Sequence, residues 1–405
     1  TPGTPAVGEV WVDTQFELTS GKTKPGTVTA VEGQTWKTTR KVALNLNNPH
    51  NLWTNEDQSL IYQTEWFDNY LTVFNRTTGV QTARTLVGPA PAHVMTRTNN
   101  GDVHVSLNGA NDVVELLPGG AVIRRNIPMS LTPGESTHPH AHWMSADGSM
   151  MVTPNPDTED STVYHFDLDA SLDKIVGRTA VGHLPIATGM MPNSSKYYVA
   201  NFLDSTISVI GIAGFPLAPA PTFLYNINLL AKYDPIGGCT TPPNPNFDCS
   251  FVGGLPIQTP VSPDGKVMMT ANTLTATLTL VDTATDKVIK MLGCEPGCHG
   301  VQFGAKLGGG YYAYVSSKFA NVMLVVDLDL NNDGSPADAD IVGRILITGD
   351  GSTAQENGKT VSGNFGMDGQ GVVPIPLVYN GCAQKLPANP TWTGGQLTAV
   401  QRNPS

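Results

Sequence analysis

The sequence predicts an all-β fold, a seven-bladed β-propeller of four-stranded antiparallel blades, and three observations support this prediction. Gly (42) and Pro (31) are abundant among the 405 residues, whereas charged residues make up only 14%. This composition is typical of short strands joined by tight turns. One apolar strand pattern recurs seven times along the chain. Most copies lie about 44 residues apart, which is the length of one four-stranded propeller blade.

The seven copies are regular apart from one long gap. Successive copies are 43, 42, 50, 44, 71 and 44 residues apart, and a Pro-rich insertion at residues 214–253 explains the longest spacing. Seven copies fit a closed ring better than an open solenoid, and another large all-β fold is the alternative. The second residues of the copies are Val28, Leu71, Val113, Val163, Ile207, Leu278 and Val322.

The repeat organises the chain as one domain. We expect a single propeller domain over residues 1–382, with the insertion 214–253 in blade five and a C-terminal tail over residues 383–405. The first unit lacks a clear innermost strand. Residues 371–378 form an apolar stretch that we expect to supply strands that close the ring.

Charge and hydropathy exclude several partner classes. The formal net charge is −11 and no basic stripe is present, which argues against nucleic acid or an anionic membrane as a partner. No apolar run reaches 18 residues, so we expect no transmembrane helix.

Five cysteines bear on the compartment. Cys239 and Cys249 bracket a loop rich in Pro and Asn, and we expect them to form a disulfide. A disulfide indicates an oxidising compartment, so we expect a secreted protein, periplasmic or extracellular. The start at Thr1 is interpreted either as an end left by signal removal or as an artificial boundary. The pairing of Cys294, Cys298 and Cys382 stays open.

The histidines fall at one phase of the repeat. Seven of the nine precede the second residue of their copy by 20 to 25 residues, whereas His104 and His165 lie inside strands. This phase is the segment that runs into the innermost strand, and in a propeller such segments converge on the central axis. Imidazoles with few carboxylates favour copper over calcium or magnesium. The alternative is that these side chains bind water or backbone. The expected copper ligands are His50, His93, His138, His140, His142, His183 and His299.

These residues carry a resemblance to known proteins. The phased segments Asn48-Pro49-His50-Asn51, His138-Pro139-His140 and Cys298-His299-Gly300-Val301 resemble the propellers of nitrous oxide reductase and thiocyanate dehydrogenase, and more broadly the YVTN-type surface propellers. In those two enzymes, histidines from several blades hold a multicopper cluster. The resemblance therefore implies a copper site with redox chemistry.

The sequence also departs from that pattern. No cupredoxin domain follows, and blades one and six carry no histidine at the shared phase. A mononuclear or trinuclear centre, open on one side toward a substrate, is therefore expected in place of a full cluster, and reduction of nitrous oxide is disfavoured.

Two further motifs suggest cofactors. Cys294-Glu295-Pro296-Gly297-Cys298-His299 is similar to a haem c attachment site but has one extra residue between the cysteines. The alternatives are a disulfide within the pair, a disulfide to Cys382, or a thiolate ligand to copper. Residues 329–340 match a calcium loop with Asp329, Asn331, Asp333 and Asp340 as ligands, and an acidic turn is the alternative.

Two charged side chains are candidates for proton transfer. Glu65 and Lys318 end the predicted second strands of blades two and seven, so each is expected near the axial metal. The alternative is that both are ordinary polar surface residues.

Together these features predict a copper-dependent oxidoreductase that acts on a small inorganic or organic molecule and exchanges electrons with a redox partner protein. Two alternatives remain: a non-enzymatic metal-binding surface or filament-forming propeller, and a haem c electron carrier. The oligomeric state, including a homo-oligomer, is left open.

Overall fold

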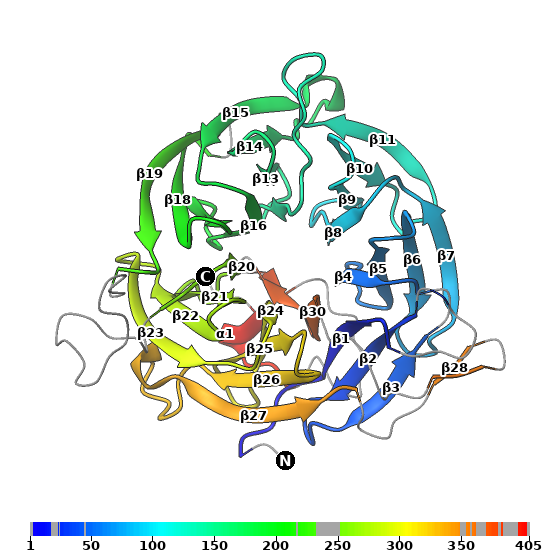
Figure 1. Ribbon diagram of the computed structural model, residues 1–405, viewed down its shortest axis with the longest axis vertical. Helices are drawn as coiled ribbons and strands as arrows, with labels where there is room; N and C mark the ends of the chain where they lie inside the picture. Colours follow the sequence, from blue (N-terminus) through cyan, green and yellow to red (C-terminus); the bar gives the residue numbers. More distant parts are fainter. Residues whose placement is uncertain are drawn as a thin grey trace.

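Seven four-stranded antiparallel sheets surround a central axis, as Figure 1 shows. The seven-bladed propeller predicted from the sequence is therefore confirmed. The computed structural model describes residues 3–17, 23, 25–43, 46–215, 218–231, 252–348, 354–356, 359–361, 370–379, 382–383 and 396–402. The Cys239–Cys249 prediction falls outside these residues, as does the side chain of Cys382.

Six blades are built from consecutive strands, each running from the axis outward. Blade two contains β4 (Pro49–Thr54), β5 (Leu60–Glu65), β6 (Tyr70–Asn75) and β7 (Gln81–Leu86); blade three contains β8 (Pro91–Thr96), β9 (Val103–Leu107), β10 (Asp112–Leu116) and β11 (Ile123–Pro128); blade four contains β12 (Trp143–Met144), β13 (Met150–Asn155), β14 (Asp160–His165) and β15 (Lys174–Ala180). Blade five contains β16 (Pro185–Met190), β17 (Lys196–Asn201), β18 (Thr206–Ala213) and β19 (Ala220–Asn228); blade six contains β20 (Pro256–Ile257), β21 (Val267–Asn272), β22 (Thr277–Asp282) and β23 (Lys287–Gly293); blade seven contains β24 (Cys298–Ala305), β25 (Tyr311–Ser317), β26 (Val322–Asp327) and β27 (Asp340–Leu346).

Blade one joins the two ends of the chain. Its innermost strand is β30 (Val372–Ile375), which pairs antiparallel with β1 (Glu9–Gln15), and β2 (Gly26–Glu32) and β3 (Thr38–Val42) complete the sheet. The ladder aligns Val12 with Val372. A strand within the predicted range 371–378 thus closes the ring, and every blade has both neighbours to pack against.

The core lies between the blades. Because each blade packs on a neighbour through both faces, its middle strands are buried on both faces, whereas outermost strands such as β7 and β11 face solvent on one side. Large side chains with relative exposure below 2% fill these layers, including Trp11, Tyr62, Tyr197, Tyr314 and Phe303. The ring is therefore a rigid support for any group held at its axis.

The fourth strand of blade five modifies one sequence-based boundary. β19 begins at Ala220, inside the range 214–253 that was assigned to an insertion. The extra residues that lengthen the spacing therefore follow Asn228 and connect blade five to blade six.

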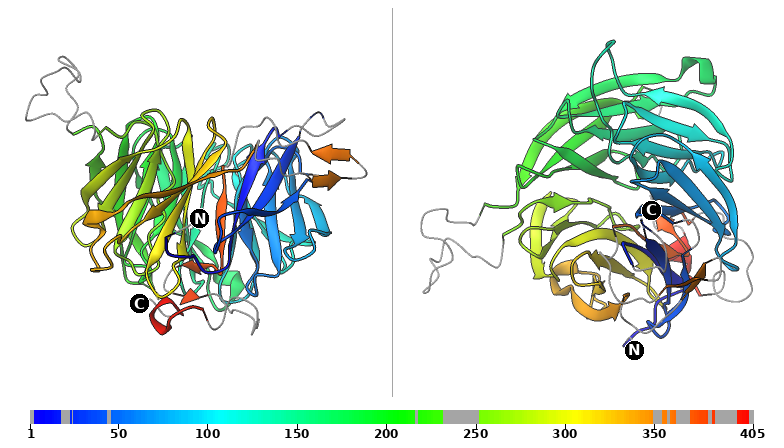
Figure 2. Two further views of the ribbon diagram at one scale, coloured as in Figure 1. Left: turned by 90° about the horizontal axis from the view of Figure 1, so that it is seen from below. Right: turned by 45° about the vertical axis from the view of Figure 1, so that its right-hand side comes forward.

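The two faces of the disc differ. We call the face at which the chain runs into each innermost strand the lead-in face. The short helix α1 (Ala399–Arg402) lies on the opposite face, where Gln401 Nε2 donates to the carbonyls of Lys306 and Gly310 in the turn from β24 to β25. Figure 2 shows the disc edge-on with α1 at one face. Within the described residues, no helix has the length and apolarity needed to cross a membrane.

Candidate metal centre

Proline marks the segments that lead into the innermost strands. Pro49, Pro91, Pro185 and Pro256 are the first residues of β4, β8, β16 and β20, and Pro139 precedes β12. Proline suits the start of a strand because it has no N–H to contribute to the ladder. The residue after the proline differs from blade to blade, and in blade seven Cys298 takes the proline's place. The following residues are His50, Ala92, His140, Ile186, Ile257 and His299.

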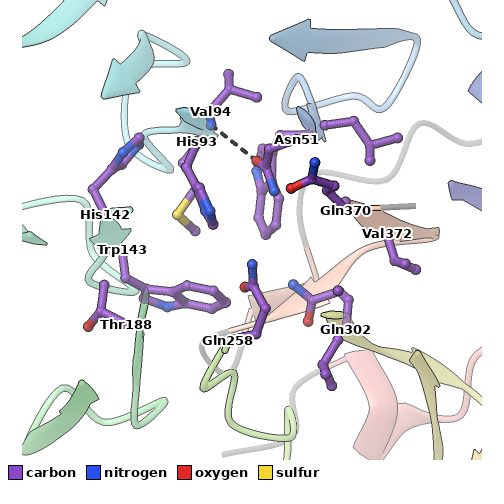
Figure 3. A pocket seen from close by; sticks show the side chains of 16 residues that line it. Asn51, His93, Val94, His142, Trp143, Thr188, Gln258, Gln302, Gln370 and Val372 are labelled. Carbon is purple, nitrogen blue, oxygen red and sulfur yellow. Dashed lines mark hydrogen bonds between the residues drawn. The ribbon is translucent and has the colours of Figure 1, made fainter. Parts of the chain in front are cut away.

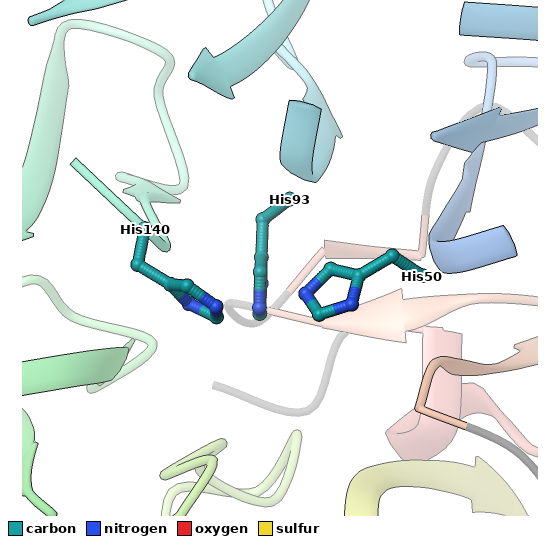
Figure 4. A group of neighbouring side chains, drawn as sticks. All are labelled: His50, His93 and His140. Carbon is teal, nitrogen blue, oxygen red and sulfur yellow. The ribbon is translucent and has the colours of Figure 1, made fainter. Parts of the chain in front are cut away.

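Three histidines meet at the axis. Each of His50, His93 and His140 offers a ligand nitrogen, and these atoms lie within 4.8 Å of one another. The ring centroids are 6.0 Å apart for His50 and His93, 5.4 Å for His50 and His140, and 5.1 Å for His93 and His140. Figure 4 shows the three rings converging from three neighbouring blades. Their exposed fractions are only 6%, 8% and 9%.

The hydrogen bonds leave ring nitrogens free for a metal. His140 Nδ1 lies 2.8 Å from the carbonyl oxygen of Ile186, which can only accept, so the proton sits on Nδ1 and Nε2 keeps its lone pair. Both ring nitrogens of His50 are buried, and neither has a hydrogen-bond partner among the described residues. An unpaired buried imidazole is costly in a metal-free protein. The triad therefore fits a group that these nitrogens would bind.

Burial keeps the cluster neutral. It lowers the pKa of His50 and His93 well below the ordinary value, and the positive charge on neighbouring imidazolium rings would lower each further. Burial likewise lowers the pKa of His140 to about 4. The three rings are therefore uncharged near neutral pH, as metal ligation requires.

Two more side chains approach the triad from the lead-in face. Trp66, directly after β5, places its ring centroid 4.5 Å from that of His50 and 5.6 Å from that of His140. Lys318, directly after β25, lies close enough for its charge to lower the pKa of His50, His140 and His299. Burial in turn lowers the pKa of Lys318 itself. The predicted location of Lys318 near the cluster agrees with this geometry, and its role in proton transfer stays a prediction.

Two further predicted ligands lie beside the triad. His299 is 6% exposed, and its Nδ1 lies 3.2 Å from the carbonyl oxygen of Gln370, which again leaves Nε2 available. His142 is 1% exposed, and burial lowers its pKa to about 3. It lies two residues after His140 in the chain and, with His93, lines the adjoining pocket described next.

This narrow pocket occupies the axis next to the triad and has about 20 Å³ of space for a water-sized molecule. Figure 3 shows several carboxamides together with His93, His142 and Trp143 around it. Among the residues that the structure describes, its lining contains no carboxylate, lysine or arginine. The blades that lack a histidine contribute amides instead, because Gln258 belongs to blade six and Gln370 to blade one. The amide-bearing residues of the lining are Asn51, Gln258, Gln302 and Gln370.

Two predicted ligands are not brought to the axis. The His183 side chain is 65% exposed, and its Nδ1 lies 2.8 Å from Asp204 Oδ1, a hydrogen bond that raises its pKa. The His138 side chain is 38% exposed, and its Nδ1 lies 3.8 Å from a carboxylate oxygen of Asp157. Both histidines precede the proline of their segment, whereas His50 and His140 follow it. The chain therefore reaches the axis only after the proline.

Glu65 is held inside blade two. Its carboxylate accepts hydrogen bonds from Thr72 Oγ1, Arg84 (3.1 Å) and the backbone N–H of Asn47 (3.3 Å). Burial raises its pKa to about 7, and these partners offset only part of that shift. The contacts assign Glu65 to bracing the segment before Pro49, and its proposed part in proton transfer stays a prediction.

The acidic loop after β26 gathers three carboxylates that only partly match the predicted set. Asp329, Asp333 and Asp338 each offer an oxygen within 4.8 Å of the others. Asp329 also accepts from the backbone N–H groups of Asp333 and Gly334. Asp340 begins β27 and accepts from the adjacent N–H of Ile341. Asn331 donates its backbone N–H to Asp338. Calcium binding stays a prediction, and the structure adds Asp338 to its candidate ligands.

Cys294 and Cys298 form a disulfide that closes the turn before β24. This is one of the pairings that the sequence left open. With the two sulfur atoms joined, neither is free in this structure for a thioether bond to haem or for a copper ligand, and the haem c alternative stays a prediction. The disulfide instead fixes the chain immediately before His299.

Comparisons with known proteins support the fold. No family model matches the chain, and no curated protein matches it. Three solved structures illustrate the likeness. A putative 6-phosphogluconolactonase from Bacteroides fragilis has a TM-score of 0.62 at 15% identity and covers 91% of this chain and 98% of its own. A periplasmic gluconolactonase from Pseudomonas aeruginosa has a TM-score of 0.63 at 14% identity and covers 84% and 97%.

The third is hydrazine synthase from Kuenenia stuttgartiensis, with a TM-score of 0.58 at 15% identity, covering 74% of this chain and 89% of its own. Identities this low indicate a shared propeller and no more, because one fold hosts many functions. They lend no particular support to nitrous oxide reductase or thiocyanate dehydrogenase. The function must therefore be argued from the site.

Proposed function

We propose that the axial cluster binds copper through His50, His93 and His140 and that the protein is a copper-dependent oxidoreductase acting on a small molecule. The observation that carries the proposal is the buried triad of neutral imidazoles with ligand atoms within 4.8 Å of one another. Nitrogen-only sites bind divalent copper most tightly among the first-row metals, whereas calcium and magnesium require oxygen ligands.

The rest of the site supports a substrate next to the metal. Three protein ligands leave a coordination position open, and the amide-lined pocket adjoins His93. Copper bound there would supply a redox-active Lewis acid, and the rigid blades would hold its ligands in place. Electrons would come from or pass to a redox partner protein. We also propose an extracytoplasmic location, supported by the Cys294–Cys298 disulfide and by the periplasmic gluconolactonase with the same fold.

Metal analysis tests this proposal. The protein is stripped with a chelator, reloaded with Cu²⁺ or Zn²⁺ in competition, and examined by mass spectrometry of bound metal and by electron paramagnetic resonance (EPR). We expect one copper per chain with nitrogen hyperfine coupling, and loss of that signal in His93→Ala and His140→Ala. His183→Ala is the matched control, because its side chain is exposed and should leave binding intact.

Three outcomes would overturn the proposal: no copper bound, zinc preferred over copper, or copper retained unchanged in the triad variants. A copper protein without a redox-active signal would favour the non-enzymatic metal-binding propeller instead.

A further inference from the structure

One position on the second strand of each blade is polar in four consecutive blades, three of which carry a histidine near the axis. We call it the girdle position. In the antiparallel ladder its residue pairs with the second residue of the blade's third strand, or with the third residue of that strand in blade one. Blades four, five and six have Pro or Ala there, whereas four consecutive blades, seven, one, two and three, carry hydrogen-bonding side chains. In blade order the residues are Asp13, Thr64, Ser106, Pro154, Ala200, Ala271 and Ser316.

Thr64 joins the lead-in segments of two adjacent blades. Its hydroxyl accepts from the backbone N–H of Asn51 at 3.0 Å, within its own blade. The same hydroxyl donates to the carbonyl oxygen of Ala92 at 2.7 Å, in blade three. Asn51 directly follows His50, and Ala92 directly precedes His93. One buried hydroxyl therefore fixes the backbone beside two of the three triad histidines.

Ser106 repeats this arrangement one blade further on. Its hydroxyl accepts from the backbone N–H of His93 at 3.2 Å and donates to the carbonyl oxygen of His140 at 2.5 Å. Ser316 accepts from the backbone N–H of Gly300, the residue after His299, at 2.9 Å. The girdle thus contacts the backbone at or next to the three triad histidines and His299.

Blade one uses a carboxylate in place of the hydroxyl. Asp13 is fully buried and accepts from the N–H groups of Gln370 (2.9 Å) and Gly371 (3.0 Å). A carboxylate cannot donate onward, and Gln63 supplies the missing donor. Its Nε2 donates to Asp13 Oδ2 at 3.0 Å and to the carbonyl oxygen of Asn51 at 2.9 Å. Because the Gln370 carbonyl accepts from His299, Asp13 links the segments that carry His299 and His50.

The girdle is not needed to build a blade. Blades four, five and six form complete four-stranded sheets with Pro or Ala at the same position. A purely structural hydrogen bond would have no reason to be confined to the blades around the cluster. Hydrogen-bonded groups behind metal ligands orient them, and their loss weakens metal binding by about 10- to 100-fold in characterised proteins.

We propose that Asp13, Thr64, Ser106 and Ser316 are positioning residues that fix the metal-binding geometry of the axial histidines, with Asp13 adding the negative charge that a site of neutral imidazoles lacks. The inference rests on the proposed copper binding. These residues do not touch the metal. They act through the backbone of the segments that carry the ligands.

Copper affinity and the EPR spectrum test this role. Ser106→Ala removes the bonds to both His93 and His140, and Asp13→Asn removes the charge and disturbs the contact with Gln63. We expect each to weaken Cu²⁺ affinity by about 10- to 100-fold in competition with a chelator of known affinity, and to change the copper hyperfine splitting. Ser106→Thr should retain wild-type values, because blade two already uses threonine at this position.

The matched control is Ser208→Ala. Ser208 is a fully buried hydroxyl in β18 of blade five that bonds to Asn201 and Asn226, away from the triad. It should lower the melting temperature as much as Ser106→Ala while leaving copper affinity unchanged. If Asp13→Asn does not fold, Thr64→Val takes its place.

The outcomes separate the two proposals. If the wild-type protein and Ser208→Ala bind copper through the triad while Ser106→Ala and Asp13→Asn bind it with unchanged affinity and spectrum, the girdle inference is wrong and the copper site stands. If the wild-type protein binds no copper, the proposed function fails and the girdle inference fails with it.

Discussion

His50 should destabilise the metal-free protein because its buried ring nitrogens lack partners, although the same nitrogens would bind the metal. The variant His50→Leu tests both effects. Both ring nitrogens of His50 are buried without a partner among the described residues, at a cost of about 1 to 3 kcal/mol for each unsatisfied group. Leucine is similar in volume and has no polar atom, so repacking should cost less than about 1.5 kcal/mol. Two unsatisfied groups less the repacking cost should make the metal-free variant more stable than wild type by at least about 0.5 kcal/mol.

Excess copper should make wild type more stable than His50→Leu, the reverse of the order expected without metal. A ligand that binds only the folded state at 1,000 times its dissociation constant stabilises the protein by about 4 kcal/mol. Wild type should gain this amount, and His50→Leu should gain much less because one of three ligands is missing. Urea unfolding with a chelator, and again with excess Cu²⁺, measures both effects. His183→Leu is the control and should match wild type in both conditions.

Two results would refute this reasoning. A metal-free His50→Leu protein less stable than wild type would show that the imidazole is satisfied in the folded state. An equal gain on adding copper to wild type and His50→Leu would show that His50 is not a ligand.

Two further predictions concern stability alone. The raised pKa of Glu65, about 7, means that the folded protein holds a proton that the unfolded chain has lost, so the free energy of unfolding should fall as pH rises from about 4.5 to about 7. The fall attributable to Glu65 is at most about 3 kcal/mol, and Glu65→Gln should abolish it when urea unfolding is measured across this range; an unchanged slope would contradict the assignment. Gly189→Ala would place a methyl 2.0 Å from the backbone oxygen of Thr259 and should destabilise by about 3 kcal/mol. Gly293→Ala, with open space around it, should change stability by less than about 0.5 kcal/mol. Urea unfolding of both variants checks this, and equal effects would refute the packing argument.

The repeat and the histidine phase were accessible from sequence because both depend on local patterns. Five of the seven phased histidines reach the axis region, whereas His138 and His183 do not. The five are His50, His93, His140, His142 and His299. The deciding feature is also local: a ligand must come after the segment's proline. Phase alone has an error of a few residues, and His183 precedes Pro185 by two.

The register shows why phase is imprecise. The repeat placed Val163 as the second residue of its strand, whereas β14 begins at Asp160 and Val163 pairs with Val152. A shift of two residues keeps every side chain on the same face of a strand, so the hydrophobic pattern cannot detect it. Counting from Val163 therefore made the phase of the blade-four histidines two residues too long.

Other parts of the site depend on tertiary structure. Trp66 lies against His50 because the turn after β5 folds over the axis, and nothing in the local pattern separates it from an ordinary strand-end aromatic. The contact of Asp13 with Gln370 joins residues 357 positions apart. No periodicity or motif reports such a pairing, which follows only from closure of the ring.

That closure has a consequence for how the protein matures. During synthesis His50, His93 and His140 leave the ribosome early, but Gln370 and β30 follow more than two hundred residues later. Until β30 docks on β1, Asp13 lacks its backbone partners and the early blades have an open edge. A nascent chain would therefore present the histidines in an unbraced arrangement. Copper should be acquired by the finished ring and not by the growing chain, so delivery of the metal would be a late step that follows folding.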